Sequence, residues 1–164
     1  MTPRVHVRPA RPEEAAAVAA LFTALNSMDG PPPPVAMTAE AVRRALLGAE
    51  PRAGLLVAEL DGGLVGFVPG NTVYDSVRAA DAVFLNDLYV VPEARRRGAG
   101  RALVARLAAT ARRRGAGCLW WGVDLGDDEA LRFYEALGAE DEGGFVGRIL
   151  VGPAFEALAM QEPG

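Results

Sequence analysis

The sequence is poor in the residues that disulfide frameworks, metal centres and membrane spans require. It has one cysteine, Cys118, and one histidine, His6, among 164 residues. A lone cysteine excludes a disulfide framework within the chain and is compatible with a reducing compartment. No apolar run is long enough to span a bilayer, and the first residues lack the apolar core of a signal peptide. We therefore expect a cytoplasmic protein with no metal and no membrane partner.

An excess of positive charge is also missing. The formal net charge is −4, whereas a general nucleic-acid binder holds the phosphate backbone with surplus Lys and Arg. We therefore expect no nucleic-acid partner. The composition is globular, with 51% hydrophobic and 23% charged residues. A chain of this length can bury a core without staples, so residues 1–164 are expected to form a single domain.

Hydrophobic periodicity predicts a domain that mixes strands and helices. Strands are expected over residues 5–8, 55–60, 64–68, 83–91, 118–125 and 143–150, and helices over residues 13–25, 38–50, 98–114 and 127–138. Residues 61–63 predict a tight hairpin turn, and residues 69–82 fit either a loop or a continued third strand. The order β-α-α-β-β-β-α-β-α-β predicts an α+β fold with a mixed, mostly antiparallel twisted sheet flanked by helices.

Two runs of three arginines lie at opposite ends of the helix expected over residues 98–114. Arg112–Arg114 lie at its C-terminal end, where the helix dipole favours cations, and a solvated helix end explains them. Arg95–Arg97 precede its N-terminus and Arg101 follows one turn inside, where the dipole disfavours cations. The pattern predicts a bound anion. Backbone amides freed at the N-terminus, approached closely at Gly98 and Gly100, would form a phosphate cradle.

These glycines match neither common nucleotide-binding motif. The Rossmann pattern needs a small residue where Leu103 stands, and a P-loop needs Lys where Arg101 stands. Arg95, Gly98 and Gly100 do match the Arg/Gln-x-x-Gly-x-Gly/Ala loop of the GNAT superfamily of acyl-CoA N-acetyltransferases. Residues 127–138 resemble the second motif of that family, with Asp where Asn is usual at the first position. Residues 85–90 are similar to its polyamine and thialysine acetyltransferase branch.

The resemblance implies an enzyme that transfers the acetyl group of acetyl-CoA directly to a primary amine of a small molecule. It makes Tyr134 the general acid and Asp87 the first candidate for the general base, with Glu59 and Asp124 as weaker candidates. The positions that it implies for binding acetyl-CoA are Leu88, Tyr89, Val90, Arg95, Arg96, Arg97, Gly98, Ala99, Gly100, Arg101, Asp127, Ala130 and Tyr134.

Three questions stay open at this point. The acceptor could instead be a protein N-terminus or lysine, although the acidic residues Asp75, Asp81, Asp87 and Asp124 favour a cationic amine. A second class of function is a non-catalytic acyl-CoA-binding regulatory module. Members of the family are often homodimers, and the apolar residues of segment 145–155 fit either a dimer interface or a core.

Overall fold

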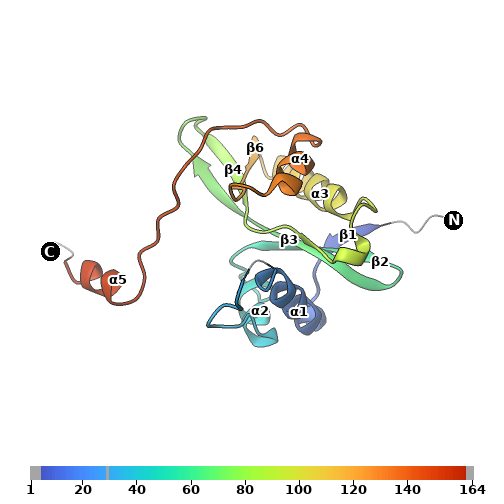
Figure 1. The fold of residues 1–164 in the computed structure, drawn as a ribbon, viewed down its shortest axis with the longest axis horizontal. Coiled ribbons are helices and arrows are strands. Elements are labelled where there is room, and N and C mark those ends of the chain that lie inside the picture. The colour runs from blue at the N-terminus through green and yellow to red at the C-terminus, as the bar shows by residue number, and fades with distance from the viewer. Residues whose placement is uncertain (1–4, 29, 162–164) are drawn as a thin grey trace. The chain divides into compact units, whose positions relative to one another are not determined.

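The computed structural model describes residues 5–28 and 30–161. The chain divides into two compact units, the first ending at Asp124 and the second beginning at Leu125. The six-stranded sheet and three helices belong to the first unit, and two short helices belong to the second (Figure 1). The single domain expected over residues 1–164 stays a prediction.

The sheet has the strand order β1-β2-β3-β4-β6, and β5 pairs with β3 beside that path. Five strands pair antiparallel, and β6 runs parallel to β4, which confirms the predicted mostly antiparallel α+β class. The strands are β1 (His6–Pro9), β2 (Gly54–Leu60), β3 (Gly63–Asp75), β4 (Ala80–Leu85), β5 (Tyr89–Val90) and β6 (Cys118–Trp120).

Helices cover both faces of the sheet in the first unit. α1 (Ala15–Asn26), preceded by a short 3₁₀ turn, and α2 (Ala39–Leu46) lie on one face, and α3 (Ala99–Arg113) lies on the other (Figure 1). The hydroxyl of Thr38 accepts the N–H of Ala41 at 3.1 Å and so caps α2, as the sequence predicts.

The core on the α1 side is built around Phe67 of β3. Its ring lies 4.3 Å from the ring of Phe22 on α1 and 6.1 Å from that of Tyr89 on β5, centroid to centroid. Val18 of α1 and Val42 of α2 are fully buried in the same cluster. The side chain of Tyr89 is thus committed to the core, which anchors the short strand that carries it.

α3 buries the apolar face that its periodicity predicts, with one exception. Leu103, Val104, Leu107 and Ala111 are buried, whereas Ala108 is exposed at the edge of the stripe.

Two sequence predictions about the middle strands are corrected. β3 continues to Asp75, so the continued-strand alternative is right for residues 69–75 and the loop alternative is wrong there. The strand predicted over residues 83–91 is two strands, because residues 86–88 leave the ladder between β4 and β5. β4 pairs with the far half of β3 and β5 with Gly66 and Phe67 nearer its start.

The second unit contains α4 (Asp128–Glu135) and α5 (Gly152–Ala159). The strand predicted over residues 143–150 is wrong, and the strand predicted over residues 118–125 extends only to Trp120. Alternating apolar residues form a strand only where a partner strand is available, and the described part of this unit has none. Phe145, Ile149, Leu150 and Phe155 are exposed, so they form no core here, and the homodimer stays a prediction.

Candidate active site

The strand β5 presents one unpaired edge. Val91 donates its N–H to the carbonyl oxygen of Val65 at 2.8 Å, so the N–H and C=O of the preceding residue, Val90, point away from β3. β6 pairs with β4 only up to Trp120, and no other described strand reaches β5. Arg95 Nε donates to the carbonyl oxygen of Val90, so the N–H of Val90 is the group of this edge that stays open to an extended ligand added as a strand.

The loop that follows β5 turns its amides outward. Arg96 and Gly98 have positive φ angles of 58° and 86°, and Gly98 is the N-cap residue of α3. Left-handed residues before a helix gather successive N–H groups into an anion-binding concavity. Among the described residues, no hydrogen bond uses the amides of residues 96–100 as donors, and the first helical bond runs from Ala102 to Gly98. These amides are therefore available to an anion at the positive end of α3.

The arginines of this loop have different surroundings. Arg95 Nε donates to the carbonyl oxygen of Val90 at 3.0 Å, and its Nη2 lies 3.7 Å from Met28 Sδ. Arg97 Nη2 lies 3.5 Å from the Asp61 carboxylate. Arg95 thus ties the loop back to β5, a positioning contact that no sequence signal indicates.

Asp87 lies between β4 and β5, directly before the open edge. It is half-buried, and burial raises the pKa of its carboxyl above the ordinary value. No salt bridge between described residues includes it. A carboxylate that is desolvated and unpaired binds a proton more readily than an exposed one, which suits a general base.

The two other candidate bases differ from Asp87. Glu59 Oε2 lies 2.9 Å from Arg8 Nη2, and the same guanidinium also contacts Glu14 Oε1 at 2.6 Å. Glu59 is thus committed to an ion pair, whereas no salt bridge between described residues includes Asp87. Asp124 is exposed at the end of the first unit.

In the second unit, α4 begins as the sequence predicts. Asp127 Oδ1 accepts the N–H of Ala130 at 2.9 Å, which caps the helix. Tyr134 lies one turn further on, and its ring contacts that of Phe133 at 5.1 Å. Burial, with the Asp127 charge as a smaller cause, raises the pKa of Tyr134 to about 12. The phenol therefore keeps its proton at neutral pH.

The structure thus brings together Asp87, the open edge at residues 88–90 and the amides at 96–100, all in the first unit. Among the other candidates, Asp127 is the N-cap of α4, and Ala130 and Tyr134 lie on that helix, all in the second unit.

Comparison with known proteins identifies the family. The model of the acetyltransferase (GNAT) family matches residues 18–139. YhfO of Bacillus subtilis, described as an uncharacterized N-acetyltransferase, is 33% identical over 150 residues, which cover 92% of this chain and 99% of YhfO. The chain belongs to the GNAT acetyltransferase family. It is therefore an acetyl-CoA-dependent acyltransferase, as the two motifs predict.

Solved structures of the family share the fold. The ribosomal-protein-alanine N-acetyltransferase from Brucella melitensis biovar Abortus 2308 superposes with a TM-score of 0.71 at 25% identity, covering 89% of this chain and 100% of that one. AAC(6′)-Iy, in complex with the bisubstrate analogue CoA-S-monomethyl-acetylneamine, has a TM-score of 0.72 at 19% identity, covering 89% of this chain and 97% of that one.

The residues of this GNAT chain fit acetyl-CoA on two counts. Pantetheine carries amide groups that an open strand edge can bind, and its diphosphate suits unpaired amides at a helix N-terminus. Both features occur here one after the other along the chain, at residues 88–90 and 96–100.

No helix in the described ranges is long and apolar enough to cross a membrane.

Proposed function

We propose that the protein acetylates a primary amine of a small cationic molecule, by direct transfer from acetyl-CoA. The observation that carries the proposal is the continuous stretch from Asp87 to Gly100, in which a desolvated carboxylate, an open strand edge and a set of unused amides follow one another. A chain that only bound acyl-CoA would need the edge and the amides but not the carboxylate.

Acetyl-CoA, when bound, supplies the acetyl group as a thioester. The main chain of Leu88, Tyr89 and Val90 holds the pantetheine arm, and the loop from Arg95 to Arg101 holds the diphosphate. The family motif implies further contacts from Ala130 on α4 and from the side chain at position 127, which is usually an Asn. The carboxylate of Asp127 accepts the N–H of Ala130, so here that side chain caps the helix.

Asp87 is the proposed general base. An amine is mostly ammonium near pH 7 and must lose a proton before its lone pair can form the new bond to the acetyl carbon. The raised pKa of Asp87 brings its proton affinity closer to the working pH. Glu59 and Asp124 remain weaker alternatives.

Tyr134 is the proposed general acid. As the carbon–sulfur bond breaks, the leaving thiolate takes the phenolic proton, which regenerates free CoA as a thiol. With a pKa of about 12, Tyr134 is protonated throughout the neutral range. The phenolate is re-protonated from solvent after the product has formed.

The decisive experiment compares Asp87→Asn and Tyr134→Phe with the parent protein, with thiol release as the readout. Each variant should lower turnover by about 10²–10⁴-fold while CoA affinity stays nearly unchanged. The acidic limb of the pH profile of kcat/KM should vanish in Asp87→Asn. In the parent protein, the midpoint of this limb should stay the same when the acceptor is changed to an amine of different pKa, because the limb reports the protonation of Asp87. Unchanged turnover in either variant would remove that residue from its role.

The acceptor is tested with a panel of aminoglycosides, polyamines and peptides. The ligand of AAC(6′)-Iy, an acetylneamine analogue, supports small amines. The name of the Brucella protein favours a second candidate, a protein N-terminus. Asp75 is a weaker recruiter of cations than the sequence suggests, because its carboxylate pairs with Arg78 at 2.7 Å. A peptide acetylated faster than every small amine would replace the first acceptor class with the second.

A further inference from the structure

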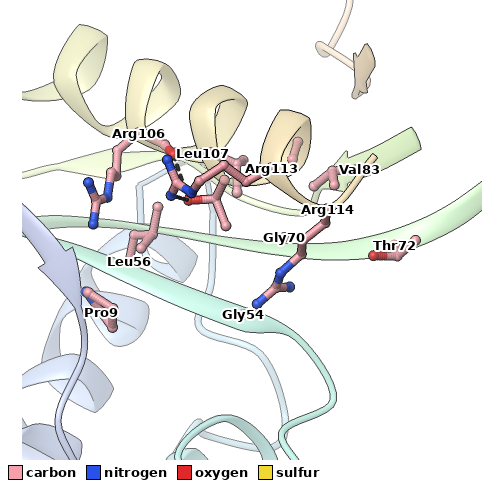
Figure 2. Close-up of a pocket in the computed structure, with 12 residues that line it drawn as sticks. Pro9, Gly54, Leu56, Gly70, Thr72, Val83, Arg106, Leu107, Arg113 and Arg114 are labelled. Carbon is pink, nitrogen blue, oxygen red and sulfur yellow. Dashed lines mark hydrogen bonds between the residues drawn. The ribbon is translucent and has the colours of Figure 1, made fainter. Parts of the chain in front are cut away.

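A hollow lies beneath the C-terminal half of α3, at the opposite end of the helix from the proposed acetyl-CoA loop (Figure 2). Its volume is about 210 Å³, and Leu56, Val83 and Leu107 supply apolar lining. The helix has 15 residues, so its two ends are about 20 Å apart at the usual rise per residue. The hollow is thus distinct from the site that the mechanism uses.

A pair of glycines opens the floor of the hollow. Gly54 of β2 and Gly70 of β3 stand opposite each other in the sheet. A Cβ on Gly70 would lie 2.9 Å from Leu107 Cδ1, so Gly70 faces α3 and the Leu107 side chain would have to shift to accommodate a larger residue there. Residues opposite each other point to the same face. Gly54 therefore also faces α3, yet a Cβ there would meet only the carbonyl oxygen of Gly70, at 3.6 Å. Packing does not require Gly54 to be glycine, and its bare backbone leaves the space open.

Three arginines in the C-terminal half of α3 and at its C-cap border this space. Arg106, Arg113 and Arg114 all line it, and Figure 2 shows Arg114 extending from the end of α3 toward Gly54. Arg113 Nη2 donates to Thr110 Oγ1 at 3.0 Å. No salt bridge between described residues includes any of the three, and no carboxylate lines the hollow. The hollow thus has an apolar floor and a cationic border with no acidic side chain to neutralise it.

We propose that this hollow binds a small amphipathic carboxylate. The apolar ring or short chain lies on Leu56, Val83 and Leu107, and the carboxylate accepts hydrogen bonds from the guanidinium groups of Arg113 and Arg114. Arginine suits this role because its planar fork matches the two oxygens of a carboxylate.

The size of the hollow restricts the ligand class. A cavity of about 150 Å³ accommodates benzene, so 210 Å³ fits a single ring with a carboxylate but not a nucleotide. A free anion with no apolar part would leave the apolar lining uncovered. A nucleic acid would need a long basic track, whereas these arginines surround one small hollow.

The test uses benzoate on the full chain, with benzamide as a neutral ring of the same shape and acetate as a carboxylate without a ring. Titration followed by two-dimensional NMR should show one benzoate site, at least about tenfold tighter than for either comparison molecule. The shifted amides should be those of Gly54, Gly70 and Thr110. They should shift equally with CoA present, because the two sites are separate.

Two kinds of variant separate this site from general attraction to arginine. Gly54→Val fills the hollow, and the double variant Arg113→Ala/Arg114→Ala removes the two exposed cations that hold the carboxylate in the proposal, leaving Arg106. Either should abolish benzoate binding, whereas Arg112→Ala, which removes the adjacent charge outside the hollow, should leave it unchanged. Equal weakening by all three, binding of acetate as tight as that of benzoate, or shifts confined to residues 96–101 would overturn the proposal.

Discussion

The two ends of α3 carry similar charges for different physical reasons. At the N-terminal end, Arg95–Arg97 stand where the helix dipole opposes them, next to amides that no described residue uses. At the C-terminal end, Arg112–Arg114 stand where the dipole favours them, and all three are exposed, as the predicted solvated helix end requires. Arg113 and Arg114 also line a hollow. The dipole explains why a charge is tolerated at an end, but the sheet beneath determines what that charge faces.

Two glycines of the sheet, Gly66 of β3 and Gly54 of β2, also differ in how much room a Cβ would have. Near the N-terminal end, a Cβ on Gly66 would lie 2.5 Å from the carbonyl oxygen of Tyr89, which is backbone and cannot rotate away. Near the C-terminal end, Gly54 has ordinary room for a Cβ. The strand β5 therefore depends on a close backbone contact, whereas the hollow depends on space that nothing fills.

The largest expected effect tests that difference. Gly66→Ala should lower the free energy of unfolding by about 3 kcal/mol, because β5 must move away from β3. Gly54→Ala should change it by no more than about 0.5 kcal/mol. Urea denaturation measures both. CoA affinity should also fall in Gly66→Ala, since residues 88–90 move with β5, and a fully stable Gly66→Ala would contradict the close contact.

The next effect contrasts the two arginine runs directly. The double variant Arg96→Glu/Arg97→Glu should weaken CoA binding about thirtyfold, or about 2 kcal/mol, because anionic side chains then face the diphosphate. Arg113→Glu/Arg114→Glu makes the same change in net charge and should leave CoA affinity within about twofold. Isothermal titration with CoA gives both values. Equal losses would mean that only the overall charge of the protein matters.

The sequence predicts well the features that depend on neighbouring residues, and it predicts poorly the features that depend on residues far apart in the chain. The helices, their caps at Thr38 and Asp127, and the hairpin at residues 61–63 depend on neighbours in sequence and are confirmed. The strand expected at residues 143–150 fails because alternation cannot tell whether a partner strand exists. The length of β3 was also ambiguous, since its far half is stabilised by pairing with β4.

The same distinction applies to the sites. The proposed acetyl-CoA loop was predictable because residues 87–101 form one continuous stretch. The hollow was not predictable from the sequence, because it forms where Gly54 of β2 and Gly70 of β3 lie opposite each other beneath α3. Likewise, nothing in the spacing of Arg95 shows that its Nε binds the carbonyl oxygen of Val90.

The smallest expected effect is that substitutions of Arg96 and Arg112, at opposite ends of α3, change the free energy of unfolding in opposite directions. Without CoA, Arg96→Gln should raise the free energy of unfolding by a few tenths of a kcal/mol, because it removes a cation from the positive end of α3. Arg112→Gln should lower it by about 0.3–1 kcal/mol, because it removes a cation from the negative end. Both side chains are exposed, so both changes should shrink as salt is raised. Thermal melts at low and high ionic strength provide the measurement.

Saturating CoA should reverse the effect of Arg96→Gln on the free energy of unfolding, since the diphosphate then offsets the dipole and Arg96 becomes favourable. A loss of stability in both variants without CoA would mean that Arg96 is held by contacts within the protein, and the electrostatic reason for expecting an anion at this loop would fail.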